Sequence, residues 1–330
     1  MHWQHRINLL AKLGDYILEN GEAWQNAKQK AIDRNAWFTQ DFIELAATNI
    51  ATAFLEKEKL ESWLKTYTLP ANPHLVGVVM AGNIPLVGFH DFLCGFLCGH
   101  NIVLKPSEKD DVLLPHLVEV LASWDEEVAT QIRFADFLKN CDAYIATGSN
   151  NSARYFEQYF GKYPHVIRRN RTSVAVLDGT ETEEDFQKLG QDIFSFFGLG
   201  CRSVTQLCVP EGYDFIPLLR SLESFRAIND HNKYRNNYDY HLAIFLLNKV
   251  PYLDNGSLLL VENEIPFSAV SVLHYRYYQD KESLLSKLRN DTDIQAIVCR
   301  EEVPFGGSQR PGLSDYADGV DTMAFLCGLG

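Results

Sequence analysis

The spacing of apolar residues over the first 70 positions predicts helices. Leucines and isoleucines recur every three or four residues between Leu9 and Leu18, which is the period of one helix face. A second helix is expected from Thr39, whose hydroxyl can cap the first turn, to about Leu55. Residues 1–70 are therefore expected to be helical.

From residue 75 the pattern changes to short apolar runs separated by helical segments. Such runs are typical of buried parallel strands, and they are expected at residues 75–80, 101–105, 143–147 and 174–177. The intervening helices are expected at residues 86–98, 110–123 and 127–139, with another after Ser149. Strands that alternate with helices imply right-handed crossovers and a doubly wound sheet.

A second alternation of the same kind begins near residue 180. Its strands are expected at residues 206–209, 243–247, 258–261, 270–273 and 294–298. Its helices are expected at residues 182–197, 214–223 and 281–289. Gly179 and Thr180 form the best boundary between the two α/β units, so the first is expected to end at residue 179.

The composition and net charge of the chain argue against several classes of binding partner. The 330 residues carry a net charge of −13, which would be repelled by nucleic acid and by anionic membranes. The sequence contains no run of about 18 apolar residues, which is the length needed to span a membrane. The N-terminus lacks the apolar core of a signal peptide. The seven cysteines are scattered and odd in number, which favours reduced thiols in a cytoplasmic protein. No spacing of histidines or cysteines indicates a metal site.

Cys201 is the first candidate for chemistry. It follows a predicted helix and the segment Gly198-Leu199-Gly200, where glycine permits tight turns and the close approach of a ligand. The adjacent Arg202 could help to keep a thiolate ionised, and a thiolate is a strong nucleophile toward an acyl carbon. The alternative interpretation is a buried structural cysteine.

Asn83 lies in Gly82-Asn83-Ile84-Pro85, between a predicted strand and a predicted helix. Its amide N–H could donate to a developing oxyanion. Alternatively, Asn83 caps the helix that follows.

Two further turns follow predicted strands and could contact a nucleotide. Lys105, Ser107 and Glu108 come directly after one strand, at the kind of edge where open α/β sheets bind nucleotides. Gly148 and Ser149 follow another strand and open a helix, whose N-terminus attracts anions. The alternative for Lys105 and Glu108 is a solvated charge pair at a helix start.

Five segments in this order resemble the motifs of the aldehyde dehydrogenase superfamily. They are Gly82 to Pro85, Lys105 to Glu108, Thr147 to Ser149, Cys201 and Pro304 to Gly307. The resemblance implies two doubly wound α/β domains with the active site between them. The nucleotide-binding domain would be 1–179 with its helical N-terminal segment, the catalytic domain 180–305, and residues 306–330 would fold back at the domain interface. It also implies that Cys201 is the nucleophile and Asn83 an oxyanion donor.

Within the superfamily the chain is most similar to the acyl-CoA reductases of the LuxC-like branch. The hydrolytic members carry a glutamate base upstream of the cysteine, and that position falls on Arg168 here. Without the base, water is harder to activate against a thioester. The chain is also short for the superfamily, and the resemblance includes no counterpart of the strands used there for oligomerisation.

The resemblance implies an acyl-CoA reductase that forms a thioester on Cys201 and reduces it with NADPH or NADH to an aldehyde. A carboxylate at Glu108 beside the adenosine ribose would favour NADH, whereas long-chain acyl reduction in the family implies NADPH. The expected partner is acyl-CoA, and the chain is expected to be a monomer or homodimer. The alternatives are an aldehyde dehydrogenase that produces the acid, and a catalytically silent acyl-binding or scaffold subunit.

Two other segments have open interpretations. Glu264 and Phe267 resemble the superfamily segment whose glutamate holds the nicotinamide ribose, although Glu264 is one residue out of register. The basic run of Arg168, Arg169 and Arg171 could attract phosphates, or it could be a solvated loop.

Overall fold

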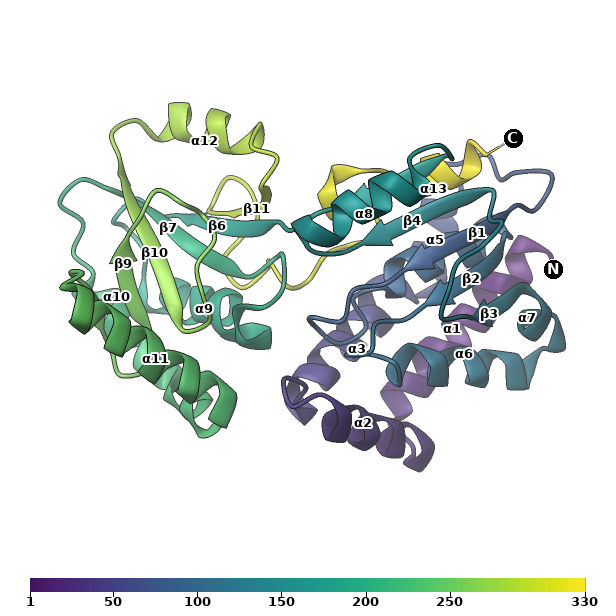
Figure 1. Ribbon diagram of the computed structural model, residues 1–330, viewed down its shortest axis with the longest axis horizontal. Helices are drawn as coiled ribbons and strands as arrows, with labels where there is room; N and C mark the ends of the chain where they lie inside the picture. The colour runs from purple at the N-terminus through teal and green to yellow at the C-terminus, as the bar shows by residue number, and fades with distance from the viewer. Residues whose placement is uncertain (330) are drawn as a thin grey trace. The chain divides into compact units, whose positions relative to one another are not determined.

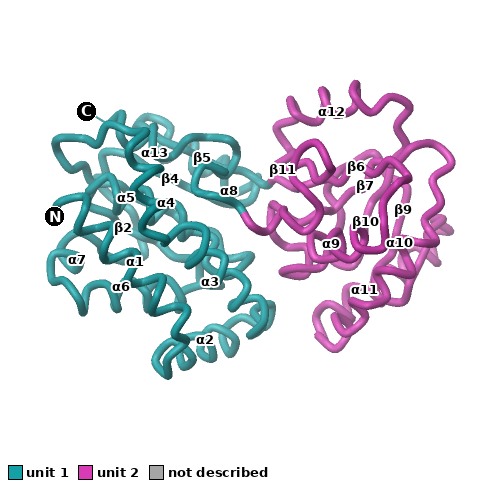
Figure 2. Tube along the Cα trace, turned by 180° about the vertical axis from the view of Figure 1, so that it is seen from behind, with its two compact units in different colours: residues 1–170, 311–330 teal, residues 171–310 magenta. Residues whose placement is uncertain are grey.

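The computed structural model describes residues 1–329, which form two compact units (Figures 1 and 2). Unit 1 comprises Met1–Asn170 and the segment from Pro311, and unit 2 comprises Arg171–Arg310. The chain therefore passes from one unit to the other before the boundary expected at Gly179, and it returns to unit 1 at Pro311.

Unit 1 begins with the helical segment that the sequence predicts. Its helices are α1 (Trp3–Glu19), α2 (Glu22–Arg34), α3 (Gln40–Phe54) and α4 (Lys57–Leu64). The Thr39 hydroxyl accepts a hydrogen bond from the Phe42 backbone N–H at 3.2 Å, so the predicted cap of α3 is confirmed. The apolar faces of these helices join one core with the sheet that follows.

The sheet of unit 1 has five parallel strands in the order β3-β2-β1-β4-β5. They are β1 (Leu75–Val79), β2 (Asn101–Lys105), β3 (Ile132–Phe134), β4 (Ala143–Thr147) and β5 (His165–Arg168). Alternate residues face opposite sides: Ile102 and Leu104 join the core of the N-terminal helices, whereas Val103 joins Tyr144 on the other face. The outermost strands, β3 and β5, were not predicted.

The remaining helices of unit 1 are α5 (Phe89–Cys98), α6 (Leu113–Trp124), α7 (Glu126–Gln131), α8 (Asn150–Phe160), the 3₁₀ turn η3 (Ala317–Gly319) and α13 (Thr322–Cys327). The prediction of a helix over 127–139 is wrong in its second half, because the chain passes directly from the end of α7 into β3. The terminal helix α13 packs against α5.

Unit 2 contains a six-stranded sheet in the order β11-β6-β7-β10-β9-β8. Its strands are β6 (Thr172–Val176), β7 (Val204–Pro210), β8 (Leu253–Asp254), β9 (Leu259–Glu262), β10 (Val272–Tyr278) and β11 (Ile294–Val298). All neighbours pair in parallel except β8 with β9. The strand predicted at 174–177 thus completes this second sheet, not the first.

The helices of unit 2 are α9 (Glu183–Phe194), η1 (Ser195–Gly198), α10 (Ile216–Ser221), η2 (Leu222–Asp230), α11 (Asn232–Asn248) and α12 (Lys281–Arg289). The strand predicted at 243–247 is wrong, because these residues form the last turns of α11. This helix is anchored by buried Tyr234 and Tyr238, while Leu246 and Leu247 are exposed.

The predicted fold class is confirmed as a mixed α/β architecture with parallel sheets and a helical N-terminal segment. Within residues 1–329, none of the helices combines the length and apolar character needed to cross a bilayer.

Candidate active site

Three of the turns singled out in the sequence lie at one edge of the unit 1 sheet. The turns follow β1, β2 and β4, which are neighbouring parallel strands, and Val79 is in register with both Lys105 and Ala146. We call this edge the carboxyl edge. The order of strands reverses between β1 and β4, and crevices at such switch points are where open α/β sheets bind ligands.

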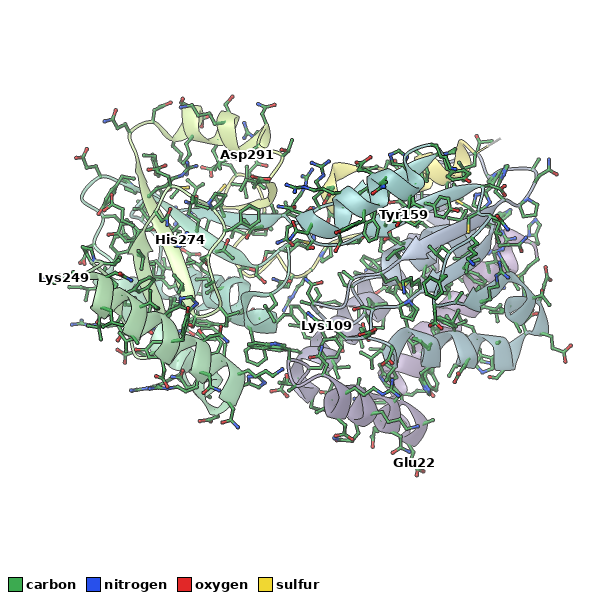
Figure 3. The ribbon with its side chains drawn as sticks, in the orientation of Figure 1. Glu22, Lys109, Tyr159, Lys249, His274 and Asp291 are labelled. Carbon is green, nitrogen blue, oxygen red and sulfur yellow. The ribbon has the colours of Figure 1, made fainter. Side chains whose placement is uncertain are left out.

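The turns after β1 and β2 pack tightly together. A Cβ atom on Gly82 would lie 2.7 Å from the Cβ of Ser107, so only glycine allows this approach. The Ser107 hydroxyl accepts the backbone N–H of Lys109, which Figure 3 labels, at 3.3 Å. Asn83 is exposed beside this contact, and the alternative that it caps α5 is wrong, because that helix begins at Phe89 with Gly88 as its cap.

Asp110 ties the same two turns together, and no motif in the sequence marks it as a site residue. Its Oδ2 accepts the backbone N–H of Leu86 at 2.8 Å, and Leu86 adopts the left-handed conformation with φ 58°. The side chain is 8% exposed. Burial raises the pKa of Asp110 to about 7, although hydrogen bonds from the backbone of Leu86 and Leu113 oppose the shift. Asp110 is therefore a buried group that fixes the end of the Asn83 turn.

The turn after β4 opens helix α8. Ser149 is exposed and caps α8 by accepting the backbone N–H of Ser152 at 3.2 Å. A Cβ on Gly148 would lie 2.9 Å from both Ser152 and Phe156, so the glycine is required by packing against α8. This turn brings the positive end of a helix to the carboxyl edge, where it favours an anion.

Lys105 and Glu108 differ in their surroundings. Lys105 is half-buried, with its Nζ 5.9 Å from the ring centroid of Phe137, whereas Glu108 is exposed. Phe137 is 78% exposed, an unusual position for a phenylalanine. Sequence reasoning missed Phe137, and its only signal is an aromatic residue in the polar segment between β3 and β4.

In unit 2, Cys201 lies in a turn just before β7. Its backbone carbonyl accepts the Ser173 hydroxyl of β6 at 3.0 Å, and Ser203 donates its N–H to the Gly200 carbonyl at 3.0 Å. Cys201 is half-buried, whereas Cys94, Cys98, Cys141, Cys208 and Cys299 are buried. The turn is thus pinned at both ends while its thiol stays more accessible than those of the core cysteines.

The backbone of the segment that precedes Cys201 is conformationally strained. Phe196, Phe197 and Gly198 have φ values of 55°, 57° and 74°, in the left-handed region that aromatic residues rarely adopt. Both phenylalanines are buried, and the ring of Phe197 lies 4.2 Å from that of His231. Packing of these rings stabilises the left-handed backbone conformation of the segment that leads into the Cys201 turn.

The Pro304–Gly307 segment owes its conformation to a buried carboxylate on α9. Asp192 accepts the backbone N–H of Gly306 at 2.7 Å, together with the backbone N–H and hydroxyl of Ser308 at 3.0 and 2.7 Å. Burial raises the pKa of Asp192, and these donors oppose the shift. Gln309 then donates to the Ser203 hydroxyl at 3.3 Å, so this segment also supports the turn of Cys201.

The segment containing Glu264 and Phe267 is also held from the sheet of unit 2. Gln206 donates to the Asn263 carbonyl at 2.8 Å, and Thr205 donates to the Pro266 carbonyl at 2.6 Å. His274, labelled in Figure 3, has its Nδ1 2.7 Å from the Ile265 carbonyl, and burial lowers its pKa. The neutral ring therefore donates from Nδ1.

The side chain of Glu264 is itself 81% exposed, and its carboxylate lies 3.5 Å from Arg276. The sheet thus fixes the backbone of this segment and leaves the Glu264 carboxylate at the surface.

At Arg168 neither interpretation of the basic run holds, because this side chain is neither solvated nor open to a phosphate, whereas Arg169 is exposed. It is 3% exposed, and it donates to Asp91 of α5 at 2.6 Å and to Thr322 of α13 at 2.7 Å. Burial lowers the pKa of Arg168, but the attraction of Asp91, the hydrogen bond to it and the charge of Asp318 together outweigh this and leave the pKa above its ordinary value. The position that the resemblance assigns to a base therefore holds a permanently charged cation within unit 1.

No cluster of three or more histidine, cysteine or acidic side chains within residues 1–329 could hold a metal ion.

Comparison with known proteins gives one family and one fold. The family model described as acyl-CoA reductase (LuxC) matches residues 48–214. No curated protein matches the sequence. Among solved structures, the NAD-dependent aldehyde dehydrogenase of Sinorhizobium meliloti is 13% identical, with a TM-score of 0.65 over 90% of this chain and 69% of that one.

Two other structures show the same relation. Aldehyde dehydrogenase 21 of Physcomitrella patens is 15% identical, with a TM-score of 0.65 over 88% of this chain and 72% of that one. An oxidoreductase of Marinobacter aquaeolei is 12% identical, with a TM-score of 0.66 over 91% of this chain and 74% of that one. The shared property is the aldehyde dehydrogenase fold, as the sequence resemblance predicts.

Replacement of Arg168 by methionine is expected to destabilise unit 1 by about 3–5 kcal/mol, because it leaves the Asp91 carboxylate buried without its cation. Urea unfolding measures the change. Arg169→Met is the matched control, since its side chain is 64% exposed and lies 3.6 Å from Glu157, and it should shift stability by less than about 0.5 kcal/mol. Equal effects of the two substitutions would contradict the structural role of Arg168.

The raised pKa of Asp110 predicts a pH dependence of stability. The folded state holds this proton more tightly than the unfolded chain, so its stabilising effect is complete below the unfolded pKa and is lost as pH rises toward about 7. Asp110→Asn, which keeps the acceptor for Leu86, should reduce the fall in thermal midpoint between pH 5 and pH 8. Asp33→Asn, at an exposed position of α2, should leave that fall unchanged.

Proposed function

The chain belongs to the acyl-CoA reductase (LuxC) family, and from that premise we propose that it reduces the acyl group of an acyl-CoA to an aldehyde through a thioester on Cys201. The observation that carries the proposal is the accessibility of this thiol. The family match over residues 48–214 includes five cysteines, of which only Cys201 is not buried. An acyl acceptor must be reachable by a substrate as large as acyl-CoA, and the other four cysteines are buried.

In the proposed reaction the Cys201 thiolate attacks the thioester carbonyl and forms a tetrahedral oxyanion. The Asn83 amide and the backbone N–H of Cys201 donate hydrogen bonds to that oxygen. Collapse of the intermediate breaks the bond to the CoA sulfur, which leaves as a thiolate, and the acyl group remains on Cys201. The chemistry that a reduced nicotinamide cofactor supplies when bound is a hydride for the thioester carbon. Cys201 is then released as the thiolate and the aldehyde departs.

The carboxyl edge of unit 1 fits a dinucleotide. It places Lys105, Ser107 and Glu108, which follow β2, at the same edge as Gly148 and Ser149, which follow β4, with β1 between these two strands. We propose that the N-terminus of α8 and Lys105 bind the phosphates, that Glu108 and Ser107 bind the adenosine ribose, and that the exposed ring of Phe137 packs against the base. In unit 2, Glu264 and Phe267 are proposed to contact the nicotinamide half.

The identity of residue 168 favours reduction over hydrolysis. A hydrolytic enzyme needs a base that removes a proton from water, and the Arg168 guanidinium cannot accept a proton. Its burial against Asp91 and Thr322 gives it a structural task instead. A thioester that is slow to react with water persists long enough to be reduced.

Incubation with radiolabelled acyl-CoA, followed by NADH or NADPH, tests the proposed function. Label should be retained on the wild-type protein and released as aldehyde after the cofactor is added. Cys201→Ser should retain no thioester-linked label, whereas Cys327→Ser, at the other half-buried cysteine, should behave like the wild type. Release only as free acid would support an aldehyde dehydrogenase. Absence of label from protein that still binds acyl-CoA would support a silent acyl-binding subunit.

The role proposed for Glu108 predicts a change in cofactor preference. A carboxylate at the ribose repels the 2′-phosphate of NADPH, so Glu108→Gln should raise kcat/KM for NADPH relative to NADH by about tenfold, equivalent to about 1.4 kcal/mol. Steady-state kinetics with both cofactors measures the ratio. The control is Glu119→Gln, at an exposed position on α6. A wild-type enzyme with a strong preference for NADPH, and no change in Glu108→Gln, would show that Glu108 faces away from the ribose.

A further inference from the structure

Two cysteines far apart in the sequence meet within unit 1. Cys98 is the last residue of α5 and Cys327 is the last residue of α13, and their Sγ atoms lie 3.6 Å apart across a separation of 229 residues. The Cys98 Sγ also lies 3.8 Å from the Met323 Sδ. These sulfurs are in van der Waals contact, and the chemistry proposed for Cys201 uses none of them.

The contact is held by hydrogen bonds at both ends of α13. At its first residue, Thr322 accepts from the Arg168 guanidinium at 2.7 Å. Near its end, the carbonyl of Leu326 lies 3.0 Å from the Nε2 of buried His100. The contact between the two thiols is therefore held in place by the packing of α13 against α5 and by these hydrogen bonds.

Both thiols can be reached by small molecules. Cys327 is half-buried. Cys98 is 4% exposed, but it lines a cavity of about 420 Å³ together with Arg6, Gly99 and Asn101. The Arg6 guanidinium donates to the Leu97 carbonyl at 3.2 Å, which brings a positive charge to the C-terminal end of α5. Neither thiol is sealed inside the core as Cys94 is.

We propose that Cys98 and Cys327 form a reversible disulfide when the protein meets hydrogen peroxide, as a redox site separate from Cys201. The Cys327 thiolate attacks one peroxide oxygen, the O–O bond breaks, and Cys327 becomes a sulfenic acid while hydroxide leaves and is protonated to water. The Cys98 thiol then attacks the Cys327 sulfur, and its proton leaves with the displaced oxygen as a second water. The two thiols lose two electrons, and these reduce the peroxide.

The surroundings of the pair assign these roles. The hydrogen bond from Cys98 lowers the pKa of Cys327, whereas the same contact and burial raise the pKa of Cys98. Cys327 is thus the more readily ionised and the less buried of the two cysteines, which makes it the attacking sulfur and Cys98 the resolving thiol. A disulfide needs its sulfurs at about 2.05 Å, so side-chain rotation and a shift of the six-residue helix α13 must close about 1.5 Å.

Peptide mass mapping under non-reducing conditions tests the proposal on the full-length protein. Treatment with hydrogen peroxide should link the peptides that contain Cys98 and Cys327, with a loss of about 2 Da that dithiothreitol reverses. Because the link closes a loop of 229 residues, it should raise the thermal midpoint by roughly 5 °C.

Matched variants make the result decisive. Cys98→Ser and Cys327→Ser should each abolish both the linked peptide and the thermal shift. Cys141→Ser, at a buried cysteine elsewhere in unit 1, should preserve them. Folded wild-type protein whose Cys327 is oxidised to the sulfinic acid without a link to Cys98, or whose linked peptides contain other cysteines, would overturn the proposal.

Discussion

The guanidinium of Arg168 is buried, and a buried cation is tolerated only where its charge is compensated. Asp91 supplies the charge and Thr322 an additional acceptor, so the ion pair joins the end of β5, the helix α5 and the terminal helix α13. Removal of any one partner would leave polar groups without water or hydrogen bonds. The segment that returns to unit 1 after Pro311 is therefore held by this interaction together with the burial of Leu313, Tyr316, Met323 and Leu326 in the core.

The same principle operates in unit 2 around Asp192. Its carboxylate is buried, and it is compensated by donors from the Gly306 and Ser308 backbone. Because those donors must converge on one carboxylate, the chain between them turns sharply, and Gly306 adopts a φ of 79°. The Pro304–Gly307 motif is thus explained by the support it gives to the turn of Cys201.

The cysteines differ in solvent exposure, and this difference separates structural thiols from those proposed to react. Most are core residues, where thiols act as small apolar side chains. The two half-buried ones lie in different units and in different surroundings. Cys201 lies in a turn that Ser173 of β6 holds in place, and it is proposed to hold an acyl group. Cys327 touches a second sulfur and is proposed to hold a disulfide. The chemistry of a thiol here follows from its neighbours.

Much of the fold could be predicted from the sequence, because each feature is local. The apolar runs of β1, β2, β4 and β11 match the observed strands within a residue, and Thr39 identifies the start of α3. The turns of the carboxyl edge follow from the same logic, since consecutive strands and helices place such turns together. The family could likewise be identified from short motifs in order.

Other features depend on partners that no local pattern reveals. The run at 243–247 is apolar enough for a strand, but it continues a helix anchored by Tyr234 and Tyr238. The strand β6 follows the first unit in sequence, yet its hydrogen bonds go to β7 and β11. Arg168 is a surface-type residue made internal by a carboxylate 77 positions away, and Cys98 meets a thiol 229 positions away. The sequence by itself determined the elements and their motifs; only tertiary structure decided which charges and thiols are buried together, because burial is a property of distant neighbours.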